Sequence, residues 1–232
     1  MIGTSFQNIG VDNTISVQDI KASGLVGLDW SFATTDGDTL MVWDASQQAY
    51  ATTLYYTGDN YDADGMMEIF GATPKTWFDT ITFATSDFVL GNGDAFWIMS
   101  STEGAKVTIA GEVPTSANSV TLVPGLNMIA NPYPKAVKIN DMFTVTGLTG
   151  LDWSFATTEG DTLMIWDASQ QAYATTLYYT GDDYDADGMM EIFGATPKTW
   201  FDTITFATAD IEIPAGGAFW IMSSGNGTLT FK

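Results

Sequence analysis

The chain lacks the residues on which most protein chemistry depends. It contains no Cys, no His and no Arg, and its 7 Lys stand against 28 Asp and Glu, which gives a formal net charge of −21. Without a cationic track it has no means of following a phosphate backbone, so nucleic acid is excluded as a partner. The missing His and Cys remove the usual ligands of zinc, iron–sulfur and haem sites and the Ser-His and Cys-His catalytic pairs. We therefore expect no enzyme and no cofactor, with oxygen-bound calcium as the one open alternative.

Long hydrophobic runs are missing as well. No apolar stretch approaches the roughly 18 residues of a membrane span, so membrane insertion is not expected. No basic segment followed by an apolar one stands at the start, and no secretory signal is visible. The lack of Cys gives no disulfide evidence for secretion, but it is compatible with an exposed protein that has dispensed with thiols.

The residues that are present describe a folded β protein. Hydrophobic residues make up 45% and aromatic residues 13% of the chain, which argues against disorder despite the charge. The abundance of Thr, Tyr, Trp, Phe and Ile favours strands over helices. The length suits two domains of roughly 100–120 residues each.

The chain consists of two copies of one unit. Residues 24–101 and 147–224 align at a constant offset of 123, with 67 identities in 78 positions. This predicts one domain over 1–112, a linker over 113–118 and a second domain over 119–232. Such near-identity on surface and core alike has two explanations, which one sequence does not separate. Either the duplication is recent, or both copies present the same surface to an identical partner.

Each copy is predicted to be an antiparallel β domain. Residues 39–44 and 49–57 are β-rich runs joined by a polar turn, which is a hairpin pattern. Further strands are expected at 66–70, 76–85 and 95–100, with closing strands at 106–111 and 227–232 and helical turns near 16–21 and 138–143. Short strands at regular spacing are typical of a sandwich or a barrel. The predicted fold class is all-β, with two tandem, near-identical antiparallel β-sandwich or barrel-like domains.

The two copies differ at their beginnings. Copy 2 is preceded by a β-prone run, Ser119–Asn127, whereas copy 1 starts at Met1 without its equivalent. Either a preceding segment was removed by processing or trimming, or the first domain truly lacks its first strand. The second case leaves an open sheet edge, which neighbouring chains could fill by strand addition.

The phrases GLNMIANPYP (residues 125–134) and IPAGGAFWIMSS (residues 213–224) resemble a known group of sequences. They look like the repeated β domains of bacterial cell-surface and secreted proteins, which carry NPYP and P-x-G-x-A-F-W phrases. The resemblance covers copy 2, while copy 1 keeps AFWIMS and has lost NPYP. It implies an extracellular or cell-surface location and a structural or accessory role, and it assigns no site.

The strongest chemical signal is an Asp-rich segment in each copy. In GDDYDADGMME (181–191) the spacing of acids and glycine matches the opening of a calcium-binding loop, although the Glu expected at loop position 12 is replaced by Gly194. The alternative is a plain Asp/Gly-rich hairpin turn. The candidate calcium ligands are the acids of both segments: Asp59, Asp62, Asp64, Glu68, Asp182, Asp183, Asp185, Asp187 and Glu191.

The aromatic residues are a second candidate, as a platform on which sugars stack. Most of them fall inside strand patterns, so core packing is the favoured interpretation. Trp77 and Trp200, which follow a Pro-Lys-Thr sequence, are the ones expected to be exposed and to bind a glycan.

Two hypotheses of function follow from these patterns. The first is a non-enzymatic extracellular structural protein whose copies self-assemble into a filament, sheath or surface layer. Head-to-tail domain contacts would mimic the internal one, and strand exchange could seal them. The alternative is a tandem carbohydrate- or ligand-binding module of a surface protein.

Overall fold

A computed structural model describes residues 2–3, 14–30, 35–58, 72–91, 93–110, 119–153, 158–181 and 195–232. These residues form a mainly β protein with several antiparallel sheets, as the sequence predicted. Within these ranges no helix has the length and apolar character needed to cross a membrane. We call residues 1–112 the first half and residues 119–232 the second half.

A six-stranded antiparallel sheet forms one layer of the first half. Its centre is the predicted hairpin, in which alternate residues such as Leu40 and Leu54 point inward and are fully buried. The strand order is β1-β11-β6-β7-β8-β9. The strands are β1 (Ile2–Gly3), β11 (Ala95–Met99), β6 (Thr39–Asp44), β7 (Ala49–Tyr56), β8 (Trp77–Asp79) and β9 (Ala84–Thr85).

Short strand pairs supply the remaining strands of this half. The residues buried between them and the large sheet include Val17, Leu90 and Phe96, which form one core cluster with Leu40 and Leu54. The pairs are β2 (Thr14–Ser16) with β10 (Val89–Gly91), β3 (Lys21–Ser23) with β12 (Lys106–Thr108), and β4 (Asp29–Trp30) with β5 (Thr35–Asp36). A 3-10 helix, η1 (Val17–Asp19), links β2 to β3. The packing is that of a β-sandwich.

The second half repeats this arrangement. Its large sheet has the order β14-β24-β19-β20-β21-β22, formed by β14 (Gly125–Ala130), β24 (Ala218–Ser223), β19 (Thr162–Asp167), β20 (Ala172–Tyr179), β21 (Trp200–Asp202) and β22 (Ala207–Thr208). The smaller elements are β15 (Val137–Lys138) with β23 (Glu212–Ile213), β17 (Asp152–Trp153) with β18 (Thr158–Glu159), and a helical turn, α2 (Ile139–Met142). A three-stranded sheet completes it, made of β13 (Ser119–Leu122), β25 (Gly227–Phe231) and β16 (Phe143–Thr146).

One predicted strand is wrong in part. The run 76–85 was expected to be a single strand, but it divides into β8 and β9, joined by a tight turn. Asp79 accepts the backbone N–H groups of Ile81 and Thr82, and Phe83 adopts a positive φ of 52°. An Asp that captures the following backbone N–H groups favours a turn over a continuous strand. The strand expected at 66–70 lies outside the described residues.

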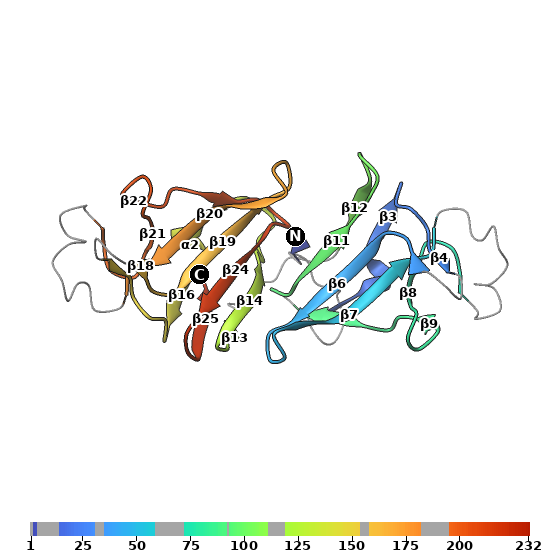
Figure 1. Ribbon diagram of the computed structural model, residues 1–232, viewed down its shortest axis with the longest axis horizontal. Helices are drawn as coiled ribbons and strands as arrows, with labels where there is room; N and C mark the ends of the chain where they lie inside the picture. The colour runs from blue at the N-terminus through green and yellow to red at the C-terminus, as the bar shows by residue number, and fades with distance from the viewer. Residues whose placement is uncertain are drawn as a thin grey trace.

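The two halves lie side by side along the longest axis of the molecule (Figure 1). Their contact is central, where β14 lies against β1 and β11. A backbone hydrogen bond of 2.9 Å joins the Ala130 N–H to the Gly93 carbonyl across this contact. An apolar cluster that includes Ala95, Met128 and Trp220 draws residues from both halves. The site described below is built on this contact.

Candidate functional site

The nine acids predicted to bind calcium lie outside the described residues, in 59–71 and 182–194. The structure therefore does not test whether they converge on a cation. Among the residues that it does describe, no group of three or more acids is close enough to hold a metal ion.

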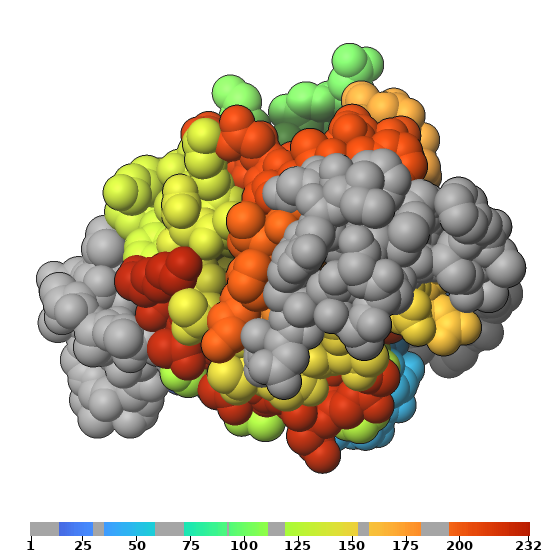
Figure 2. Space-filling model, turned by 90° about the vertical axis from the view of Figure 1, so that its left-hand side faces the viewer, coloured from blue at the N-terminus to red at the C-terminus, as the bar shows by residue number. Residues whose placement is uncertain are grey.

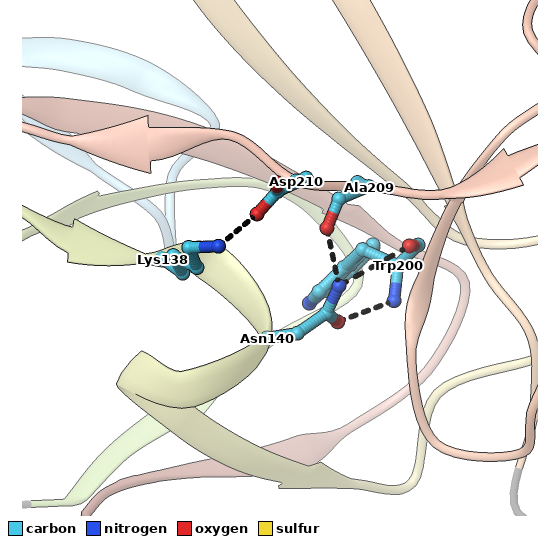
Figure 3. A network of polar contacts seen from close by, with 5 residues as sticks. All are labelled: Lys138, Asn140, Trp200, Ala209 and Asp210. Atoms are coloured by element: carbon cyan, nitrogen blue, oxygen red, sulfur yellow. Dashed lines mark hydrogen bonds and ion pairs between the residues drawn. The ribbon is translucent and has the colours of Figure 1, made fainter.

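The expectation that Trp77 and Trp200 are exposed is wrong. Their exposed fractions are only 1% and 2%, and Figure 3 shows how Trp200 is held. The Asn140 side chain accepts a hydrogen bond from the backbone N–H of Trp200 at 2.8 Å and donates one to the Ala209 carbonyl at 2.9 Å. In the first half, the Gln18 side chain accepts the backbone N–H of Trp77 at 3.1 Å. The indole rings are core residues, so they offer no face on which a sugar could stack.

Basic side chains gather at a cleft of about 430 Å³ in the second half. Lys135, Lys138 and Lys232 line it with Asp141 and Glu212. Lys138 forms an ion pair of 2.5 Å with Asp210 (Figure 3), and this partner raises the lysine pKa. Figure 2 faces the end of the molecule at which the second half lies. Because both members of the ion pair are largely exposed to solvent, we expect it to contribute little to stability.

A ring of six aromatic side chains occupies the contact between the halves. Trp43 packs edge to face on Trp220, and Trp97 does the same on Trp166, with ring centroids 5.0 Å apart in both pairs. Tyr50 packs on Trp43 at 5.1 Å and Tyr173 on Trp166 at 5.0 Å. Tyr50 also neighbours Trp97, and Tyr173 neighbours Trp220, which closes the ring. We call these residues the aromatic ring: Trp43, Tyr50, Trp97, Trp166, Tyr173 and Trp220.

The aromatic ring is reciprocal. Trp43 and Trp166 are equivalent positions of the two copies, and so are Trp97 and Trp220. The contact from Trp43 to Trp220 is therefore repeated, with the roles of the halves exchanged, by the contact from Trp166 to Trp97. This is the signature of a two-fold, self-complementary interface, in which both partners use the same face.

The environment of the aromatic ring changes the chemistry of its polar groups. Burial raises the pKa of Tyr50 to about 12, and the nearby Tyr173 hydroxyl adds to this, whereas the Trp97 indole opposes it. Burial likewise raises the pKa of Tyr173. The buried Nε1 atoms of Trp97 and Trp220 approach these hydroxyls without reaching hydrogen-bond geometry, and within the described part of the chain they have no other partner. Two desolvated indole N–H groups are a cost that the surrounding aromatic packing must offset.

Gln48 adds a polar clamp to the contact. It stands in the β6–β7 turn, accepts the Leu126 N–H at 2.6 Å and donates to the Leu126 carbonyl at 3.0 Å. The Trp43 indole donates to the same carbonyl at 2.8 Å. Gly125 is required beside it, because a Cβ there would lie 2.2 Å from the Gln48 Oε1 and the backbone φ is +101°.

A cleft of about 370 Å³ opens beside this contact. Its carboxylates are Asp44 and Asp94, and its walls include Phe88 and Val120. Asp44 is already engaged by the Ser46 and Gln47 side chains and backbone, and these hydrogen bonds hold its pKa below the ordinary value. A general acid needs a raised pKa, so this carboxylate is poorly suited to that role.

Two buried acids carry no sequence pattern that distinguishes them from the other acids of the chain. Asp38 and Asp161 are equivalent, and each is 3% exposed. Asp38 accepts hydrogen bonds from the N–H groups of Val26 and Ser101 and from the Ser100 hydroxyl. Burial raises the pKa of Asp38, but these hydrogen bonds outweigh burial and lower it overall. Asp38 therefore ties the start of β6 to two loops, which makes it a structural residue.

Comparisons of the chain with protein-family models, with curated proteins and with solved structures find no match.

Proposed function

We propose that this protein is a non-enzymatic, extracellular structural subunit that self-assembles into a filament, sheath or surface layer through faces equivalent to its internal contact. The observation that carries the proposal is the aromatic ring. Each half contributes the same three side chains to it, Trp43, Tyr50 and Trp97 or their copies. A half cannot distinguish its own partner from the corresponding half of another chain.

The reciprocity decides what such an assembly looks like. Each chain carries two self-complementary faces, one on each half. When they pair with each other, the chain is closed and monomeric. When each pairs with a neighbouring chain, growth continues at both ends and produces an open polymer, or a ring if the geometry closes. The intermolecular contact then joins the aromatic face of the second half of one chain to the equivalent face of the first half of the next.

Charge is the main obstacle to assembly. The net charge is −12 over residues 1–116 and −9 over 117–232, so neighbouring subunits repel one another. Calcium bound by the Asp-rich segments would offset this repulsion, and we include it in the proposal as a promoter of assembly.

The experiment combines electron microscopy with sedimentation velocity over a range of protein, salt and calcium concentrations. Polymers are expected, and the variant Trp43→Ala, which truncates the first half's face of the aromatic ring, should shorten or abolish them. A matched control is Ile81→Ser, since Ile81 is 86% exposed in a hairpin turn away from the aromatic ring and should leave assembly unchanged. Isolated monomers under every condition would refute the proposal.

A further inference from the structure

Two equivalent tyrosines belong to the aromatic ring, one from each half. Tyr50 of β7 and Tyr173 of β20 occupy the same position in the two copies, 123 residues apart. Residues near the axis of a two-fold contact approach their own equivalents across it. Burial is the main cause of the raised pKa of Tyr50, and the Tyr173 hydroxyl lies near enough to raise it further. The two phenols are therefore neighbours across the contact between the halves.

Indole side chains hold both phenols in place. Tyr50 packs on Trp43 with ring centroids 5.1 Å apart, and Trp43 packs in turn on Trp220 of the other half at 5.0 Å. Tyr173 neighbours Trp220 and packs on Trp166 at 5.0 Å. The position of each phenol relative to the other is thus fixed by contacts that belong to both halves.

Both phenols are also open to solvent. Tyr50 and Tyr173 have exposed fractions of 41% and 43%, whereas Tyr56 and Tyr179, on the same two strands, are 1% exposed. An oxidant that acts at the protein surface therefore reaches the first pair and not the second. Thiols are the usual first targets of oxidants, and because the chain contains no Cys they do not compete here.

We infer that Tyr50 and Tyr173 form a site of oxidative modification, at which the two phenol rings couple into a dityrosine that locks the contact covalently. Within one chain the link joins the two halves, and this form rests only on the contact described above. Between chains the link joins neighbouring subunits, and this form rests on the proposed self-assembly. In both cases the aromatic ring positions the phenols and an external oxidant drives the coupling.

The coupling consumes hydrogen peroxide, with a haem peroxidase as the catalyst. Each phenol loses one electron and its hydroxyl proton and becomes a phenoxyl radical. The two radicals form a carbon–carbon bond between ring carbons next to the hydroxyl-bearing carbons, and the hydrogen displaced from each ring carbon returns to the phenol oxygen. The two electrons and two protons reduce one hydrogen peroxide to two waters. The product is therefore two hydrogen atoms lighter than the starting protein.

The first test treats the 232-residue protein with a haem peroxidase and limiting hydrogen peroxide, at a concentration where sedimentation shows monomers. Dityrosine fluorescence and a mass loss of two hydrogen atoms are expected, without dimers on a denaturing gel. After digestion, the cross-linked fragments should contain Tyr50 and Tyr173. Dityrosine confined to other positions, or no dityrosine at all, would overturn the inference.

Conservative variants separate this pair from the other tyrosines. Tyr50→Phe and Tyr173→Phe each keep a ring for packing but remove the phenol, so each should abolish the link. The matched control is Tyr55→Phe, which changes a half-buried residue further along β7 that is not part of the aromatic ring, and it should leave the yield unchanged. Equal yields from all three variants would contradict the assignment.

The link should depend on the folded contact. In urea that unfolds the chain, the same treatment should lose its preference for the pair of Tyr50 and Tyr173. Because the link joins positions 123 residues apart, it constrains the unfolded chain as a disulfide would, and the oxidised protein should unfold at a higher urea concentration than oxidised Tyr50→Phe. An equal yield of this link in urea would show that the fold does not bring the phenols together, and an unchanged midpoint would show that the link does not lock the contact.

Oxidation under assembly conditions tests the link between chains. Where microscopy shows polymers, the treatment should produce covalent dimers and larger species on a denaturing gel, and the double variant with Tyr50→Phe and Tyr173→Phe should lose them. Monomers that form only the link within the chain would support the modification site and refute self-assembly. Polymers without this link in either state would refute the modification site and leave self-assembly intact.

Discussion

At the scale of single residues, buried polar side chains hold loops in place through hydrogen bonds to their backbone. Asp38 joins the loop at Val26, the start of β6 and the segment after β11 with one carboxylate. Nothing in its sequence context distinguishes it from the other acids of the chain, since partners such as Ser101 lie 63 positions away. Its role could be found only when the fold brought these segments together.

The pH dependence of stability provides a test of Asp38. Because the folded-state pKa of Asp38 lies below the ordinary value of 3.8, its ionised form stabilises the protein above about pH 4. That contribution is lost as the pH falls through the folded-state pKa. Asp38→Asn should therefore lower the free energy of unfolding by about 1–3 kcal/mol at neutral pH. The difference from the wild type should shrink below pH 4, as measured by urea unfolding.

The control is Asp36→Asn, which removes the same charge from an exposed position in β5. It should change the free energy of unfolding by no more than about 0.5 kcal/mol. A deficit of Asp38→Asn that persists unchanged at low pH would contradict the ionised hydrogen-bonded role.

At the scale of secondary-structure elements, local patterns predicted the regular parts well. The hairpin of β6 and β7, the strands β11 and β25 and both helical turns are confirmed. The run 76–85 was predicted poorly because its alternation resembles a strand, while Asp79 provides a turn. The exposure of Trp77 and Trp200 was predicted from a neighbouring Pro-Lys pair, but their burial is set by Gln18 and Asn140, about 60 residues away.

The clamp between Gln48 and β14 offers a matched pair of variants. Gln48→Ala removes two hydrogen bonds that fix Leu126 and should lower the free energy of unfolding by about 1–2 kcal/mol. Among the described residues, Gln171→Ala at the equivalent turn removes only a hydrogen bond within the turn, and it should cost much less. Urea unfolding of both variants measures the difference, and equal losses would show that the clamp does not stabilise the contact.

At the scale of the whole molecule, the sequence predicted the repetition but could not predict its symmetry. The offset of 123 shows that the copies are alike, yet it does not say which faces meet. For aromatic residues such as Trp43 and Trp97, the sequence offers two interpretations, core packing and sugar stacking. Neither interpretation identifies them as a contact between the halves. A contact of this kind depends on the rigid-body placement of two units, which local patterns do not encode.

The net charge makes assembly depend on salt. With −21 on each chain, repulsion between subunits extends over about 10 Å at 0.1 M salt and about 3 Å at 1 M. Because the aromatic ring itself is uncharged, added salt should screen the repulsion without weakening the contact. Light scattering should show assembly increasing with sodium chloride. Assembly that dissolves on adding salt would indicate that ion pairs, and not the aromatic faces, hold the subunits together.

The geometry of the aromatic ring also makes the protein its own optical probe. Four of its eight tryptophans stand in edge-to-face pairs with centroids 5.0 Å apart. At such separations the electronic transitions of the two indoles couple, which produces a paired-band signal in circular dichroism. That signal reports every closed pair of faces, whether the partner belongs to the same chain or to another. Spectroscopy thus counts the contacts, while hydrodynamics shows which chains they connect.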